Sequence, residues 1–526
     1  MIHPLINPTH PLYRLSPKFI RRNDLTDSIR LMIVYNAYRA QILGNWGIIT
    51  ELAKEYQVSR TFIYSLLSHF KEAIPLLFSD KNKENRSHTK KHICSILLAL
   101  RLEGRCSIDA TSTLMKRFNL SYSSMGTVSQ TLSRIGGLLP KTLKNKSDEV
   151  SLLVFAGDEI FCKSTPILIT VDPISSVILR IEPSDQRTAV EWGHHFNAIQ
   201  TQGFKAIALV SDEGKGLCAA QKTVLPDILW QADSYHAVAH RLGEWVNRLE
   251  RSAYAAIKAE EKYKKSFHSA KSHKTIEKYS LLYVQAIEKP KKSIFRYDEF
   301  NHLYRYLIQE LNVFDSEGNL QNRHQVKENI QIIFELIREL KHEKINKAMR
   351  GAENILDNLL NYFDEAKKII NHCQTLGIPE EALKTLCLAW QWNKSVIKSK
   401  VKKRKYYAIK QRRFYSEVSE GFIGEDYEYL KEKVEGELDK IIQASSMVEC
   451  INSLLRPYLN NSRNQVNQKF LNLFMFYHNH RRYRAGKRKN KTPMEILTGK
   501  EQKEDWIDIL IQTIEEKEPQ FFINNL

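Results

Sequence analysis

Cysteine is scarce and scattered in this 526-residue sequence, and its seven cysteines form no C-x-x-C pair. A disulfide framework or a structural zinc site would need such grouping, so neither is expected. No run reaches the ~18 consecutive apolar residues that a membrane-spanning helix requires. The first residues also lack the continuous apolar segment and the cleavage site of a signal peptide. We therefore expect a soluble intracellular protein with no membrane partner.

Acidic residues are outnumbered, and the formal net charge of +19 comes from 79 Lys and Arg against 60 Asp and Glu. An excess of this size favours polyanionic partners, although a general lysine bias is the plainer alternative. Two runs without any acid, 401–415 and 481–492, hold seven basic residues each, and aromatic residues interrupt the first. Such runs can neutralise phosphates and stack on bases, or form solvated helix faces. The residues assigned to DNA binding here are Lys402, Lys403, Arg404, Lys405, Arg412, Arg413, Arg481, Arg482 and Arg484.

The length predicts three or four folding units. Residues 1–145 have helical patterns, with two tandem helix-turn-helix candidates at 47–73 and 107–138. In the first, Ser59 would cap the second helix and leave three residues pointing outward to contact DNA. A plain helical hairpin is the alternative. The outward residues are Arg60, Thr61 and Tyr64.

Between 146 and 244 the pattern changes to short β-rich runs with two amphipathic helices, in the order βββαβαβ. This order is that of an RNase H-like α/β core with parallel strands covered by helices. Residues 245–435 follow helical spacing throughout and are assigned to an all-helical insertion. The second part of the core, 436–498, and a helical tail, 499–526, complete a multidomain fold that mixes α and α/β regions.

Two acids stand at strand positions that otherwise favour apolar residues. Asp158 interrupts the run VFAGDEIF, and Asp212 ends the run ALVSDEG. A carboxylate there is costly unless it is paired or binds a cation, whereas a capping or turn residue is the alternative. Glu159 and Glu213 are the alternatives to these two acids, if the register assigned to either strand is wrong by one residue. Asp172, directly before a proline, is interpreted as a hairpin residue.

A third acid, Glu449, lies in the helical run SSMVECINSLLRPYL, on the side opposite its apolar residues. Arg456 would lie two turns further along the same side, where it could hold a DNA phosphate. Gly214-Lys215-Gly216 lacks the spacing of a phosphate-binding loop, so no nucleotide cofactor is implied.

With Asp158, Asp212 and Glu449 on this order of elements, the chain resembles the DDE catalytic core of insertion-sequence transposases and retroviral integrases. The tail, with Tyr477 and Asn479 before basic residues, is similar to the closing segment of many bacterial transposases. The chain departs from the compact members of this family in the interval from Asp212 to Glu449, which spans 237 positions. A helical insertion of this kind resembles the hAT and Mutator types, whose D-x-x-H motif is matched by Asp233 to His236.

This resemblance implies a DNA transposase, an Mg²⁺-dependent polynucleotidyl transferase in which the three acids bind two Mg²⁺ ions, with Mn²⁺ as a substitute. It implies that Asp233, His236 and Arg456 support the site, and that a tryptophan of the insertion, Trp390 or Trp392, supports a flipped base. The expected partners are the double-stranded DNA of transposon ends and target, and the expected assembly is at least a homodimer in the bacterial cytoplasm, at the nucleoid. Two alternatives are a domesticated, non-catalytic DNA-binding repressor and a structure-specific nuclease or resolvase.

Overall fold

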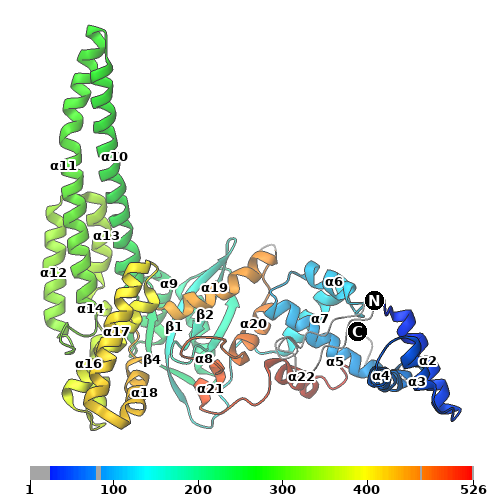
Figure 1. The fold of residues 1–526 in the computed structure, drawn as a ribbon. Coiled ribbons are helices and arrows are strands. Elements are labelled where there is room, and N and C mark those ends of the chain that lie inside the picture. Colours follow the sequence, from blue (N-terminus) through cyan, green and yellow to red (C-terminus); the bar gives the residue numbers. More distant parts are fainter. Residues whose placement is uncertain (1–23, 79–84, 463–464, 524–526) are drawn as a thin grey trace. The chain divides into compact units, whose positions relative to one another are not determined.

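The computed structural model describes residues 24–78, 85–462 and 465–523 of the chain. They belong to two compact units, Met1–His92 and Ile93–Leu526, and each is considered by itself. The described chain is mostly helical and contains a five-stranded mixed sheet in the second unit (Figure 1). No described helix combines the length and the apolar character needed to cross a membrane.

The described part of the first unit includes the helices α2 (Asp27–Ile42), α3 (Ile48–Glu55) and α4 (Arg60–Phe78), and α5 (Asn85–Leu98) begins near its end. Helices α2, α3 and α4 bury a small core in which Leu52 of α3 packs with Ile63 of α4. The turn between α3 and α4 passes through Gln57 in the left-handed region, at φ 53°. The Ser59 hydroxyl then accepts a hydrogen bond from the Phe62 amide at 3.1 Å, which caps α4 as the sequence indicates.

The sheet of the second unit has the strand order β3-β2-β1-β4-β5. Strands β1, β2 and β3 pair antiparallel, whereas β4 lies parallel to both β1 and β5. Helices α8 and α9 connect the parallel strands, so the elements follow the predicted order βββαβαβ. The bounds are β1 (Ser151–Cys162), β2 (Thr165–Val171), β3 (Ile178–Pro183), α8 (Ala189–Gln200), β4 (Phe204–Ser211), α9 (Lys215–Val224) and β5 (Leu229–Ala232).

The two faces of the sheet are covered by different helices, and the alternation of side chains along β1 decides which residue faces which. Phe155 packs with Trp192 of α8 on one face. Ala156 and Ile160 belong to the core of the other face, together with Val448 of α19. Asp158 shares the parity of Ala156 and Ile160, so its carboxylate lies on the side of α19. The helices that complete this side are α19 (Ser446–Asn461) and α20 (Gln468–His480).

Helix α7 packs closely on α20. A Cβ built on Gly136 would lie only 2.1 Å from the Lys469 carbonyl oxygen, and the Asn472 amide donates to the Gly136 and Leu139 carbonyls at 3.0 and 2.8 Å. The second predicted helix-turn-helix segment, 107–138, therefore forms part of the core of the second unit. This segment forms α6 (Ile108–Arg117) and α7 (Met125–Leu138). The remaining described helices outside the helical region between β5 and α19 are α5 (Asn85–Leu98), η2 (Ala99–Glu103), α21 (Pro493–Thr498) and α22 (Trp506–Lys517).

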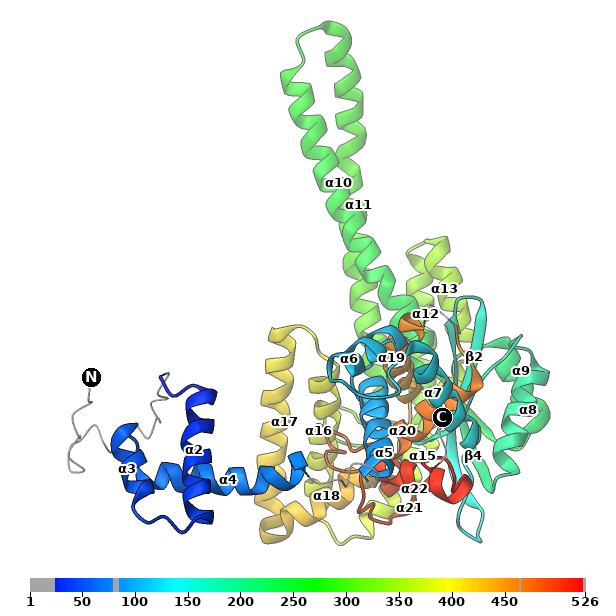
Figure 2. The ribbon, with the colours of Figure 1, turned by 90° about the vertical axis from the view of Figure 1, so that its right-hand side faces the viewer.

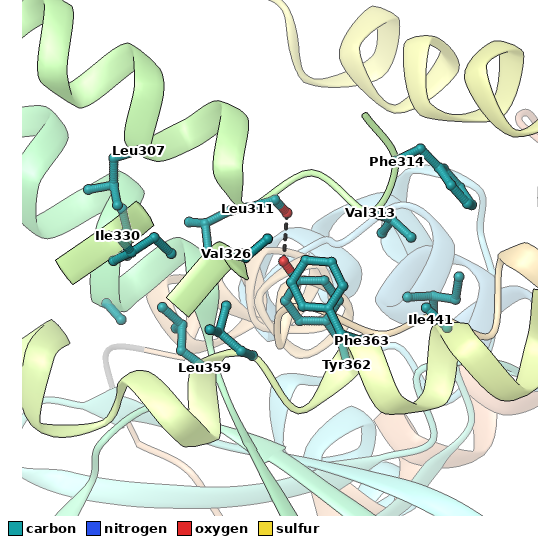
Figure 3. Close-up of a cluster of buried hydrophobic side chains, with 14 of the residues drawn as sticks. Leu307, Leu311, Val313, Phe314, Val326, Ile330, Leu359, Tyr362, Phe363 and Ile441 are labelled. Carbon is teal, nitrogen blue, oxygen red and sulfur yellow. Dashed lines mark hydrogen bonds between the residues drawn. The ribbon is translucent and has the colours of Figure 1, made fainter. Parts of the chain in front are cut away.

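Between β5 and α19 the chain is helical, and α10 and α11 form a long antiparallel hairpin that extends away from the sheet (Figures 1 and 2). The shorter helices pack around a large apolar core, in which the Tyr362 hydroxyl donates to the Leu311 carbonyl at 2.8 Å (Figure 3). The bounds are η3 (Tyr235–His240), α10 (Arg241–Ser269), α11 (His273–Glu310), α12 (Arg323–Glu339), α13 (Glu343–Asn354), α14 (Leu356–Leu359), α15 (Tyr362–Gln374), α16 (Glu380–Lys398), α17 (Lys402–Ile423), η4 (Gly424–Asp426) and α18 (Tyr427–Leu438).

Candidate functional site

Asp158 and Asp212 meet at one edge of the parallel part of the sheet. Ala156 of β1 pairs with Val210 of β4, and continuing this register by two residues brings Asp158 level with Asp212, directly after β4. Neighbouring strands lie ~4.8 Å apart, and residues of the same parity point to the same face. The two carboxylates are therefore neighbours on the face covered by α19.

Helix α19 adds Glu449 to these acids. One turn after Glu449, the Asn452 side-chain amide donates to Asp158 Oδ2 at 2.8 Å, which fixes the helix over the strand. The pKa of Asp158 is raised to about 7, mainly by burial; the carboxylates of Asp212 and Glu449 contribute to this shift, and the hydrogen bond from the Glu159 amide opposes it. Three acids distant in the sequence thus act on one another electrostatically.

His236 contacts the third acid directly. Its Nε2 lies 2.6 Å from Glu449 Oε1, and about a third of each side chain is exposed. His236 belongs to η3, the single π-helical turn that follows β5. Its charge also opposes the upward shift of the Asp158 pKa. The D-x-x-H histidine therefore lies among the three acids.

Asp233 holds the two segments that carry His236 and Glu449. It is 2% exposed, and its Oδ1 accepts hydrogen bonds from the amides of Tyr235 and His236 at 2.7 and 3.0 Å. Its Oδ2 accepts from the amide of Ser445 at 2.8 Å and from the Ser445 hydroxyl, at the residue that begins α19. Asp233 is consequently a positioning residue, with both oxygens already used.

The three acids fit a divalent cation by charge and by ligand type, because Mg²⁺ prefers carboxylate oxygens. Within residues 24–78, 85–462 and 465–523, however, no group of three or more His, Cys, Asp or Glu side chains is arranged to hold a metal ion. One oxygen of Glu449 contacts His236, and Asp212 Oδ1 accepts the Gly214 amide at 2.9 Å. Each carboxylate keeps further acceptor sites that could bind a cation.

The neighbouring acids have other partners. Glu159 points to the opposite face of the sheet, where Trp192 Nε1 donates to it at 3.0 Å and Arg187 lies 3.3 Å away. Glu213 is paired with Arg241 at 2.9 Å. Asp172 is a hairpin residue, as the sequence indicates, because its Oδ2 accepts the Ser175 amide at 2.8 Å.

A pocket of about 660 Å³ opens beside these residues. Its lining mixes acidic and basic side chains, because Glu244 of α10 stands among the basic residues and Glu213 is paired with Arg241. The acidic residues are Asp212, Glu213, Asp233 and Glu244, and the basic residues are His236, His240, Arg241, Lys344 and Lys347. The pocket therefore presents charged groups of both signs to a ligand.

Several residues assigned to DNA binding are exposed. In the first unit, Arg60, Thr61 and Tyr64 lie on the open side of α4. In the second, the first turn of α17 exposes four basic residues, and Tyr406 beside them is 73% exposed. Arg456 and Arg484 are also exposed. The four residues of α17 are Lys402, Lys403, Arg404 and Lys405.

Other assigned residues are held by contacts within the protein. Arg482 donates to Glu495 at 3.0 Å and also bonds the Gln502 carbonyl, so it supports the capping box at the start of α21. Arg412 donates to Asn393 at 3.0 Å and Arg413 to Glu417 at 2.7 Å. The Arg481 guanidinium lies 5.5 Å from the centre of the Tyr477 ring. The basic runs are thus only partly available to a ligand.

Trp390, which was expected to support a flipped base, is buried within the protein. It is 1% exposed, and its Nε1 donates to Asp439 Oδ1 at 2.7 Å. Phe314 packs edge-on against the ring, and the Lys394 ammonium lies 3.6 Å from the ring centre. Because its partners enclose the ring, Trp390 supports helix packing here and offers no surface to a base. Trp392 is half-buried and packs against Tyr407.

Sequence reasoning did not assign Asn452 or Arg241 to the site. Asn452 stands three residues after Glu449, on the same side of the helix, and this spacing was an available signal. The pairing of Arg241 with Glu213 joins segments whose proximity depends on the whole fold, and no local pattern indicates it.

No protein-family model matches the chain, and a search of curated proteins gives no match either.

Proposed function

We propose that this protein is a DNA transposase of the DDE type, a polynucleotidyl transferase with an RNase H-like core interrupted by a helical insertion. The observation that carries the proposal is the convergence of Asp158, Asp212 and Glu449 at the edge of the parallel strands. The strand order β3-β2-β1-β4-β5 and the helix pair α3–α4, as a DNA-reading helix-turn-helix unit, support it.

The acids would hold two Mg²⁺ ions, for which Mn²⁺ could substitute. Bound there, the metal would activate an attacking water or 3′-hydroxyl and stabilise the leaving oxygen of a phosphodiester. The chain's own residues perform the remaining tasks. Asn452 orients Asp158, Asp233 fixes the start of α19, and the exposed basic residues of α17 neutralise DNA phosphates. His236 holds Glu449 through the contact between its Nε2 and Glu449 Oε1.

The test uses purified protein, Mg²⁺ or Mn²⁺, and DNA carrying the ends of the genomic element that encodes the gene. We expect end cleavage and strand transfer. Asp158→Asn, Asp212→Asn and Glu449→Gln should each lower the rate by ~100-fold or more, because each removes several kcal/mol of charge stabilisation. DNA binding should persist in all three variants.

Asp185→Asn is the matched control, since it neutralises an exposed acid that follows β3. It should cleave like the unchanged protein. Cleavage at the normal rate by the three acid variants would show that the site is misassigned.

A second candidate function is sequence-specific DNA binding without catalysis, as in a repressor derived from a transposase. The observation that favours it is the exposure of the basic residues on α4 and α17, which could bind DNA without any contribution from the three acids. DNA binding by the unchanged protein, with no cleavage in either metal, would support this candidate.

A further inference from the structure

A second, smaller pocket lies where the end of α16 meets the start of α19. Its volume is about 230 Å³. The residues that line it include Lys394 and Lys398 of α16, Asp439 after α18, and Ser446 and Met447 in the first turn of α19. None of them belongs to the three acids or to the basic runs, although Ser446 stands only one turn before Glu449.

The two lysines bring positive charge that the surrounding protein does not neutralise. Among the described residues, neither ammonium group has an ion pair or a hydrogen bond, and the Lys394 ammonium lies 3.6 Å from the centre of the Trp390 ring. Burial, together with the charge of Lys398, lowers the pKa of Lys394 to about 7, so this lysine is only partly charged near neutral pH. The pKa of Lys398 is also lowered by burial.

The acids close to the pocket are already engaged. Asp439 accepts from Trp390 Nε1 through Oδ1 at 2.7 Å and from Lys487 Nζ through Oδ2 at 2.9 Å. Asp233, which attracts Lys398 electrostatically, spends both oxygens on backbone amides and on Ser445. Lys394 and Lys398 therefore have no acidic partner of their own, and a bound anion would favour the charged form of both.

The beginning of α19 contributes donors to the same space. Ser445 stands at the N-cap position, but its hydroxyl bonds Asp233, so no side chain caps the helix. The first amides of an uncapped helix are unsatisfied donors with partial positive charge. Ser446 and Met447, which carry such amides, line the pocket.

We propose that this pocket binds a phosphate group, held between the ammonium groups of Lys394 and Lys398 and the first turn of α19. Two lysines and a helix N-terminus form a recurrent arrangement for a phosphate oxyanion. Because the bound group would lie at the start of the helix that carries Glu449, a backbone phosphate of nucleic acid is the expected source. That source rests on the proposed function, whereas phosphate binding itself does not.

The experiment uses the full chain with two probes, inorganic phosphate in calorimetry and a labelled DNA duplex of random sequence in anisotropy titrations. The titrations run between ~50 and ~200 mM salt, where the slope of log affinity against log salt counts neutralised phosphates. Lys394→Met and Lys398→Met retain the apolar stem and remove the charge. We expect each to reduce the magnitude of the slope by about 1.

Lys368→Met is the matched control, because it removes the same charge from a side chain that is 75% exposed on α15, outside the pocket. It should leave the slope unchanged. If the duplex slope falls but phosphate alone does not bind, the pocket recognises the nucleic-acid backbone. If phosphate binds, binding is lost in both pocket variants, and the duplex does not bind the unchanged protein, the pocket takes free phosphate and the proposed function fails. Unchanged slope and phosphate affinity in both pocket variants would overturn the pocket assignment, even with tight DNA binding.

Discussion

Asp158 is a carboxylate placed where its charge is unfavourable. It lies within a strand, its pKa is raised from 3.8 to about 7, first by burial and then by Asp212 and Glu449, and its strongest side-chain contact is the amide of Asn452. Perturbed pKa values of this kind gather at functional sites, although structural clusters also produce them. At this site burial is the main cause and two other acids add to it, and a cation beside the three carboxylates would oppose both effects.

A pH dependence of stability follows from this shift. Between its ordinary value of 3.8 and about 7, the folded protein binds a proton at Asp158 that the unfolded chain has released. The contribution of Asp158 to stability therefore declines as pH rises through this window. Asp158→Asn should be more stable than the unchanged protein near pH 8, by on the order of 1–3 kcal/mol, and the gap should close towards pH 4.

Thermal unfolding followed by circular dichroism, without metal, would measure this difference. Asp185→Asn, at an exposed position, should show no comparable trend with pH. A constant difference between Asp158→Asn and the unchanged protein across the whole pH range would contradict the assigned shift.

The elements near the site were largely predictable from local patterns. The strand runs around Asp158 and Asp212 coincide with β1 and β4, because β-rich alternation and turn residues are local signals. The start of α4 at Ser59 is likewise local, since a cap needs only its own first turn. The contacts of Trp390 and Arg482 were not predictable. Each depends on a partner brought by another part of the chain, Asp439 for the first and Glu495 for the second.

The packing of α7 on α20 gives a test at the scale of elements. Gly136→Ala would place a methyl group 2.1 Å from the Lys469 carbonyl oxygen, so the helices would have to separate. We expect the free energy of unfolding to fall by about 1–3 kcal/mol, because the cost of the clash exceeds the gain in helix propensity.

Gly137→Ala is a close control in the same helix. Its new methyl group would meet only Lys469 Cε, at 3.8 Å, so helix propensity should stabilise this variant by up to ~1 kcal/mol. Equal stabilities of the two variants in urea titrations would show that α7 does not pack on α20 in this way.

At the scale of the whole molecule, the proposed function assigns recognition of the DNA sequence to the first unit and phosphodiester chemistry to the second. Arg60, Thr61 and Tyr64 are exposed on α4 and make no contribution to the small core of the first unit. Replacing all three by alanine should therefore leave the unfolding temperature nearly unchanged, since exposed substitutions typically cost within ~0.5 kcal/mol each.

The same triple variant should lose preference for the element's ends over random DNA. Each lost base contact removes ~1–3 kcal/mol of discrimination, which corresponds to about tenfold or more in relative affinity. Competition binding measures the ratio directly, with the Lys368→Met protein as a control for lost charge. A ratio equal to that of the unchanged protein would indicate that α4 does not read DNA sequence.

The bond from Asp233 to Ser445 joins the place where the helical region leaves the sheet to the place where the chain returns, and the Ser234 amide strengthens this link by donating to the Gln443 carbonyl at 3.1 Å. Entry and exit are thus tied at one point, across an interval of 212 positions. The helical region between these ends also holds the edge of the sheet, because the Asn361 side chain donates to the Trp230 carbonyl at 2.8 Å and the Gln231 side chain donates to the Leu359 carbonyl at 3.0 Å. The place of Glu449 over Asp158 therefore depends on how the helical region packs against β5 as well as on α19 itself.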